Sequence, residues 1–177
     1  MINPFTGGLE FRRLKNSNQN NNDNHFSDLN SNFCPIQSSL RLEKKIKLVK
    51  DVAEEIVVEE ELKSLFEKNE MPICYDGFEP SGRMHIAQGI LRAINVNRLT
   101  KAGCIFIFWI ADWFAQMNNK MEGDIEKIKI VGRYFIEIWR AVGMDLKNVK
   151  FLWCSEEINK NSNDYWQVLL MLQEIVL

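Results

Sequence analysis

The residues best suited to chemistry lie between positions 75 and 89, where glycines and polar side chains follow a short apolar run. The segment contains Tyr75, Glu79 and His85, and a helical pattern of apolar residues begins at Ile86. Glycines let a backbone approach a ligand closely and a helix N-terminus favours anions, so this turn is suited to a nucleotide phosphate. His85 could donate hydrogen bonds to that phosphate and stabilise charge in a phosphoryl or nucleotidyl transfer, although a helix-capping role is equally open.

The residues of this segment and of its neighbours argue against several kinds of nucleotide-binding and catalytic site. It has neither the G-x-G-x-x-G pattern of dinucleotide-binding turns nor the lysine of a P-loop, so both of those functions are disfavoured. Ser81 lacks the G-x-S-x-G context of a nucleophilic serine and is interpreted as a turn or cap residue. Asp112 follows a second apolar run, where a buried carboxylate needs a partner, and the sequence leaves open a ligand amine or a structural cap.

These residues must be positioned by elements whose patterns alternate along the chain. Three apolar runs predict strands at residues 71–75, 104–110 and 149–153. The longer periodic segments between them predict helices, and the alternation predicts an α/β fold with a Rossmann-like parallel sheet and flanking helices. Function is expected where the carboxyl ends of the strands meet, in residues 75–88, 112–116 and 155–157.

Composition divides the chain into three parts. Residues 1–40 contain an asparagine-rich tract and little apolar material, so we expect a disordered tail. Residues 41–70 carry two amphipathic patterns and are expected to form a helical N-terminal extension. Residues 71–177 hold the three strands and are expected to form the first half of a doubly wound catalytic domain. The last residues are apolar and have no capping signal, so we expect the sequence to be incomplete at its C-terminus.

Charge and cysteine content exclude several classes of protein. The formal net charge of −2 at pH 7 argues against a protein that coats nucleic acid through bulk positive charge. The four cysteines show no C-x-x-C pairing, so buried thiols in a reducing compartment are favoured over a metal site or a disulfide. No apolar run approaches the roughly 18 residues of a membrane span and no signal-peptide core is present, so we expect a cytoplasmic protein with no membrane partner.

The motifs together resemble those of a known family. Residues 75–82, 85–88, 102–104 and 110–113 occur in the order and spacing of tyrosyl-tRNA synthetases of the eukaryotic and archaeal kind, particularly plant-like and protist forms. The resemblance spans residues 41–177. It implies a class I catalytic domain that activates L-tyrosine with ATP and Mg²⁺, forms tyrosyl-adenylate and transfers tyrosine to tRNA-Tyr. It also implies no metal held by the protein itself. For the full-length family it implies a homodimer, whose interface is expected to be largely absent from these residues.

The resemblance assigns roles to individual residues. The implied tyrosine-binding residues are Tyr75, Glu79 and Asp112. The implied ATP-binding residues are Gly77, Phe78, Pro80, Ser81, His85, Ala87 and Gln88. His85 and Gln88 are the implied catalytic residues, because they occupy the histidine positions of the family's His-x-Gly-His signature. Ala87 replaces the glycine of that signature, and Gln88 replaces the second histidine with a group that can hydrogen-bond but cannot carry charge.

Three hypotheses about function follow. The first is a tyrosine-tRNA ligase present as a partial chain, because the family's second signature, a lysine-methionine-serine loop, has no counterpart in these residues. The second is a non-catalytic synthetase-like module that binds tyrosine, RNA or a protein. The third is another nucleotidyltransferase with the same histidine signature, which the tyrosine-containing turn disfavours.

Overall fold

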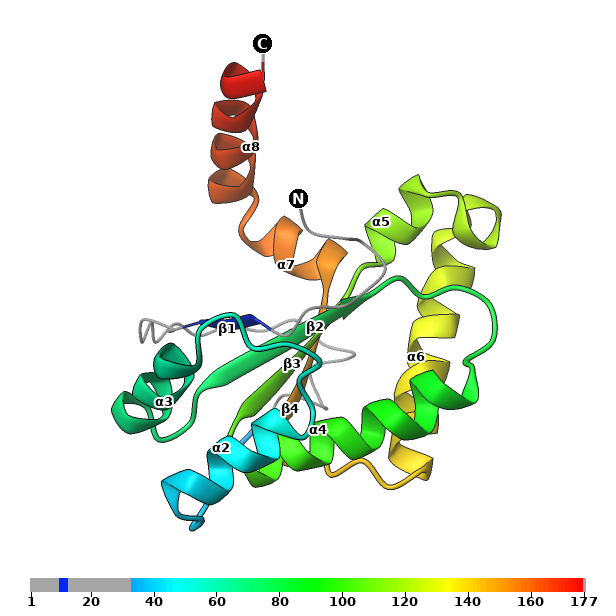
Figure 1. Ribbon diagram of the computed structural model, residues 1–177. Coiled ribbons are helices and arrows are strands. Elements are labelled where there is room, and N and C mark those ends of the chain that lie inside the picture. The colour runs from blue at the N-terminus through cyan, green and yellow to red at the C-terminus, as the bar shows by residue number, and fades with distance from the viewer. Residues whose placement is uncertain (1–9, 13–32, 177) are drawn as a thin grey trace.

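A single four-stranded sheet organises the protein. The computed structural model describes residues 10–12 and 33–176 (Figure 1). The strands lie in the order β1 (Glu10–Arg12), β2 (Ile73–Phe78), β3 (Ile105–Ile110) and β4 (Val149–Trp153). β2, β3 and β4 pair in parallel, and β1 pairs antiparallel with the outer edge of β2. The parallel strands with helices between them confirm the predicted Rossmann-like α/β fold.

Helices connect the parallel strands and also lie before β2 and after β4 in the chain. Before β2 lie α2 (Leu42–Lys50) and α3 (Glu59–Lys68). Between β2 and β3 lie η1 (Ala87–Leu91) and α4 (Arg92–Lys101). Between β3 and β4 lie α5 (Asp112–Met117), η2 (Lys120–Gly123) and α6 (Ile125–Ala141). After β4 come α7 (Cys154–Lys160) and α8 (Ser162–Val176), and α8 extends away from the sheet (Figure 1).

The core lies between one face of the sheet and the helices α4 and α6. Strand residues alternate between fully buried and half-buried, so one face is covered more completely than the other. On the covered face, Phe108 stacks on Trp139 of α6 with 4.5 Å between ring centroids and on Phe151 at 5.3 Å. This aromatic column joins β3, β4 and α6 through dispersion and hydrophobic burial. It fixes α6 relative to the strand ends that carry the site.

Most of residues 1–40, which were expected to form a disordered tail, lie outside the described residues. Within the described part, residues 10–12 form β1, and residues 33–41 have no regular secondary structure but make hydrogen bonds. The N–H of Ile36 donates to the side chain of Asn148 at 2.7 Å, and the Asn148 amide donates to the Ile36 carbonyl at 2.8 Å. Local composition does not reveal these contacts, because their partner is a buried asparagine 112 residues away.

The boundaries of several elements differ from those predicted. Of the two helices expected in residues 41–70, the first ends at Lys50, and residues 51–58 lie outside regular secondary structure. β2 begins and ends later than the predicted strand, because its six residues pair in register with all six of β3.

Cys74, Cys104 and Cys154 are buried as predicted. No helix in the described part of the chain combines the length and apolar content that a membrane crossing requires.

Gly132 allows α6 to lie close to the turn that follows β2. A Cβ at this position would be 2.6 Å from Cη2 of Trp153 and 3.3 Å from Cγ of Pro80. We expect Gly132→Ala to lower the free energy of unfolding by about 1–2 kcal/mol in urea titrations, because overpacking costs more than the gain in helix propensity. Gly77→Ala is the control, since its nearest neighbours would be at 3.8 Å. A neutral or stabilising Gly132→Ala would contradict this packing argument.

Candidate functional site

The carboxyl ends of the three parallel strands are joined by direct contacts. The N–H of Ala111, just after β3, donates to the carbonyl of Phe78 at the end of β2, at 2.9 Å. Asp112 then bonds Ser155, which follows β4. These contacts place the segments after β2, β3 and β4 at one edge of the sheet, where open α/β sheets bind their ligands.

β2 carries the first of the candidate residues. Tyr75 lies in the middle of the strand and is half-buried on the face opposite Asp76. Gly77 and Phe78 also belong to the strand, so the prediction that the strand ends at Tyr75 is wrong. The pairing of Phe78 with Ile110 extends the strand to that point. Tyr75 is therefore held by a paired backbone, which restricts its motion more than a turn would.

The turn after β2 begins at Glu79. Glu79 is half-buried, and its Oε1 accepts a hydrogen bond from the side-chain amide of Asn118, at the end of α5, at 2.7 Å. Pro80 is fully buried, whereas Ser81 is exposed. Gly82 has φ of +63°, a conformation that favours glycine. The turn is thus anchored at Glu79 and Pro80 and open to solvent after them.

The histidine signature begins the next helical segment. His85, Ala87 and Gln88 are all exposed at this edge of the sheet. The carbonyl of His85 accepts from the N–H of Gly89 at 3.0 Å, and Oε1 of Gln88 accepts from the N–H of His85 at 3.4 Å. Residues 87–91 form a π-helical turn, an irregularity that is frequent at functional sites. The side chains of the signature are accessible to a ligand.

Asp112 is held by protein groups instead of facing solvent. It is 0% exposed. Its Oδ1 accepts from the N–H of Ser155 at 2.9 Å and of Trp113 at 3.0 Å, and its Oδ2 accepts from the Ser155 hydroxyl. Of the two interpretations that the sequence left open, these contacts favour the structural cap. The carboxylate ties the start of α5 to the start of α7.

Asp76 and Arg92 form a buried ion pair that the sequence reasoning missed. Asp76 is 8% exposed, and its Oδ2 lies 2.9 Å from the guanidinium of Arg92 at the start of α4. Burial raises the pKa of Asp76, and the charge of Arg92 and the N–H of Gly77 only partly counteract it. The available signal was the alternation of Cys74, Asp76 and Phe78, which places Asp76 on the covered face once the strand extends to Phe78.

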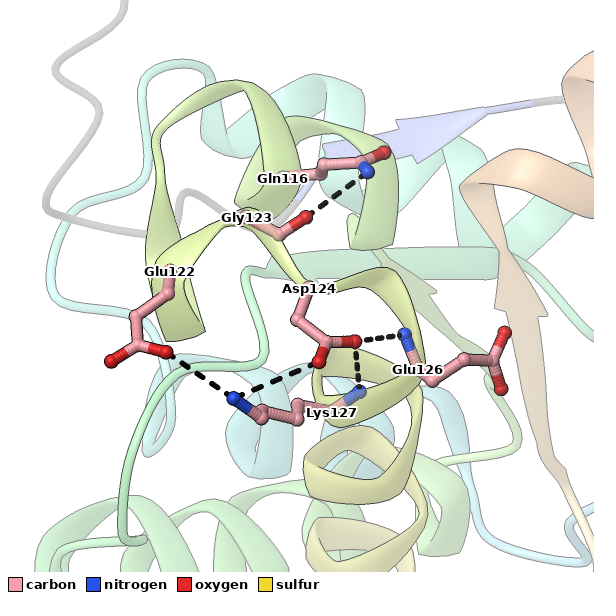
Figure 2. Close-up of polar contacts among 6 residues, drawn as sticks. All are labelled: Gln116, Glu122, Gly123, Asp124, Glu126 and Lys127. Atoms are coloured by element: carbon pink, nitrogen blue, oxygen red, sulfur yellow. Dashed lines mark hydrogen bonds and ion pairs between the residues drawn. The ribbon is translucent and has the colours of Figure 1, made fainter.

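The loop between α5 and α6 borders Glu79 and is internally braced. Figure 2 shows the side-chain amide of Gln116 donating to the carbonyl of Gly123 at 3.1 Å. Asp124 accepts from the backbone N–H groups of Glu126 and Lys127 and caps α6 (Figure 2). These backbone hydrogen bonds, first that of Lys127, lower the pKa of Asp124. The bracing fixes the loop that follows Asn118 at the end of α5.

Left-handed backbone at several non-glycine residues adds strain to this loop. Asn119, Met121 and Glu122 have φ of 52°, 51° and 63°. Such conformations cost free energy and persist only where surrounding contacts determine them.

Within the described residues, no group of three or more histidine, cysteine or acidic side chains is arranged to hold a metal ion.

Comparisons with known proteins agree with this arrangement. Residues 67–176 match the family described as tRNA synthetases class I (W and Y). Tyrosine-tRNA ligase 1, cytoplasmic, of Arabidopsis thaliana is 59% identical over 134 residues, which are 76% of this chain and 35% of that protein. The tyrosine-tRNA ligase of Picrophilus torridus is 41% identical over 126 residues, or 71% of this chain and 36% of its own length. The chain therefore spans about a third of the length of these two relatives.

Solved structures show the same similarity. The Leishmania major tyrosyl-tRNA synthetase in complex with tyrosinol has a TM-score of 0.70 and 57% identity, covering 72% of this chain and 24% of that chain. The Archaeoglobus fulgidus tyrosyl-tRNA synthetase complexed with L-tyrosine has a TM-score of 0.67 and 34% identity, covering 76% and 41%. These findings confirm the resemblance that the motifs indicated.

Proposed function

We propose that the chain, which belongs to the family of class I tRNA synthetases (W and Y), binds L-tyrosine and ATP and forms tyrosyl-adenylate. In this proposal Tyr75 and Glu79 face the amino acid, while Gly77, Phe78, Pro80 and Ser81 border the adenylate. His85, Ala87 and Gln88 face the phosphates. Mg²⁺ would be carried by the phosphates of ATP. The product would be transferred to tRNA-Tyr by a cytoplasmic homodimer, consistent with the Arabidopsis relatives named cytoplasmic.

One observation carries this proposal. A tyrosine on β2, a glutamate anchored at the following turn and an exposed histidine signature lie within residues 75–88, at one edge of the sheet. Such a segment can present an amino acid and a triphosphate to each other, which converts the encounter of two ligands into a reaction between bound neighbours. The Leishmania synthetase in complex with tyrosinol and the Archaeoglobus synthetase complexed with L-tyrosine support tyrosine as the amino acid.

The contacts of Asp112 modify the tyrosine-binding set. With no exposed surface and three donors on its carboxylate, Asp112 supports the pocket by joining α5 to α7. We therefore propose that its role in tyrosine binding is indirect. Tyr75 and Glu79 remain the residues proposed to contact the substrate.

The test of the proposal is amino-acid discrimination by Tyr75. We expect the 177-residue chain to bind tyrosine at least about tenfold more tightly than phenylalanine in equilibrium dialysis, because a site that hydrogen-bonds a hydroxyl rejects an analogue without it. Tyr75→Phe should remove most of that preference by weakening tyrosine binding alone. Tyr134→Phe, exposed on α6, is the control and should change neither affinity. Equal binding of both amino acids by the unmodified chain would contradict the proposal.

Adenylate formation separates the ligase from the non-catalytic alternative. Tyrosine-dependent exchange of labelled pyrophosphate into ATP would support a catalytic chain. Tyrosine binding without exchange would favour the synthetase-like binding module.

A further inference from the structure

One backbone carbonyl in the histidine signature is displaced from the regular helical hydrogen-bond pattern. In an α-helix the carbonyl of Gln88 would accept from the N–H of Arg92, four residues later. Here the N–H of Arg92, which follows the π-helical turn, donates to the carbonyl of Gly89, three residues earlier. The carbonyl of Gln88 instead accepts from the indole N–H of Trp139, on α6, at 3.0 Å.

Trp139 is a rigid donor. It is 1% exposed, stacks on Phe108 at 4.5 Å and meets Phe78 edge-on at 5.2 Å. Arg92, which is paired with Asp76, lies 6.0 Å from the centre of the Trp139 ring. The indole N–H is therefore fixed to the sheet, independently of the helical segment that it contacts.

We propose that Trp139 is a positioning residue, which holds the π-helical turn and thereby orients His85 and Gln88 toward ATP. A π-turn contains one more residue than the matching α-turn, and each residue advances a helix by about 100°. Without the indole donor, the carbonyl of Gln88 can recover the N–H of Arg92 in a regular α-helical hydrogen bond, in place of the bond from Arg92 to Gly89. The residues that precede Gln88 would then rotate around the helix axis by the angle of one residue, about 100°. The inference rests on the proposed function, because ATP is the ligand that this orientation serves.

The packing around the segment agrees with a fixed register. A Cβ at Gly89 would be 3.2 Å from the sulfur of Met84 and 3.7 Å from Ile138, so this residue already lies close to α6. Residues 85–88 are exposed, whereas the next residue, Gly89, is buried. A change of register would move Gly89 away from α6 and expose different side chains at the site.

Trp139→Phe tests the inference, because it keeps an aromatic ring and removes the donor. In the 177-residue chain we expect ATP binding, measured by calorimetry with MgATP, to weaken about tenfold, the equivalent of one hydrogen bond. Tyrosine affinity should stay within about twofold. Amides of residues 89–93 should exchange at least about tenfold faster with deuterium, since the segment gains access to a second register. Trp166→Phe, the same change at a side chain 55% exposed on α8, should alter none of these quantities.

The outcomes separate this inference from the proposed function. Unchanged amide exchange with unchanged ATP affinity would overturn the inference, and so would equal losses for ATP and tyrosine, which indicate a general structural role. If the unmodified chain binds neither ligand, the proposed function fails, and the amide-exchange comparison alone decides whether Trp139 holds the π-turn. If Trp139→Phe does not fold, site-specific benzothienylalanine at position 139 preserves the shape of tryptophan without the N–H, and the same expectations apply.

Discussion

Asp112→Ala is expected to lower the free energy of unfolding by about 3 kcal/mol or more, measured by urea titration. The substitution leaves the N–H and hydroxyl of Ser155 and the N–H of Trp113 without their acceptor. Each buried donor left unsatisfied costs about 1–3 kcal/mol, and part of this cost is recovered if water enters. The loss should be large because Asp112 has no exposed surface through which water could replace it.

A double-mutant cycle with Ser155 shows whether this loss comes from the proposed contacts. Ser155→Ala alone should cost less, because Asp112 retains two backbone donors. The loss of stability in the double variant should be smaller than the sum of the two single losses by about 1 kcal/mol, because each substitution removes the same hydroxyl–carboxylate contact. Additive losses would contradict a direct contact between the two side chains.

Asp145→Ala is the matched control for Asp112→Ala. Asp145 is exposed and accepts one backbone hydrogen bond, from Lys147 at 3.1 Å. Water can replace that acceptor, so the loss of stability should be much smaller than at Asp112. Equal losses at both aspartates would mean that burial does not determine the effect.

The parallel sheet could be predicted from the sequence because its signal is local. The run at residues 105–110 is apolar at every position, as expected for a strand covered on both faces, and short apolar runs alternate with helical patterns. The alternation is sufficient to predict parallel strands joined by helices. It does not fix strand ends, because a strand continues for as long as its neighbour offers hydrogen-bond partners. This is why β2 extends through Gly77 to Phe78.

The candidate site was predictable where its motif is continuous in sequence. Tyr75, Glu79 and His85 belong to one segment, and their family resemblance could be seen without a structure. The role of Asp112 could not be decided, because its partner Ser155 lies 43 residues away on another strand end. The π-turn was also hidden, since a single extra residue changes the period of apolar residues too little to detect.

Arg92→Met is expected to destabilise the protein by about 2 kcal/mol at neutral pH, in urea titrations. Methionine keeps an unbranched side chain near Trp139 but leaves the carboxylate of Asp76 buried without its ion partner. Removing one partner of a buried pair costs about 3–5 kcal/mol, and we discount this value because the Arg92 side chain is 26% exposed. Arg140→Met, which breaks an exposed pair with Glu137, is the control and should have little effect.

The pH dependence of this loss identifies Asp76 as its cause. Burial raises the pKa of Asp76 above the ordinary value that an aspartate has in the unfolded chain, so the native state retains a proton where the unfolded state has lost it. The contribution of this group to stability is therefore greatest at low pH and falls as pH rises through that window. Without Arg92 the pKa rises further, so the difference between Arg92→Met and the unmodified chain should shrink as pH is lowered. A difference that does not vary with pH would contradict an electrostatic origin.

Asp76→Asn in the Arg92→Met background separates the buried charge from the loss of arginine packing. Asparagine has nearly the same shape as aspartate and carries no charge, so it needs no ion partner on the covered face of the sheet. We expect the double variant to recover most of the stability lost at neutral pH and to lose the pH dependence. If stability is not recovered, the guanidinium acts mainly through its contact with Trp139. If it is recovered, the charge of Asp76 makes Arg92 necessary at the start of α4, directly after the turn that carries the histidine signature.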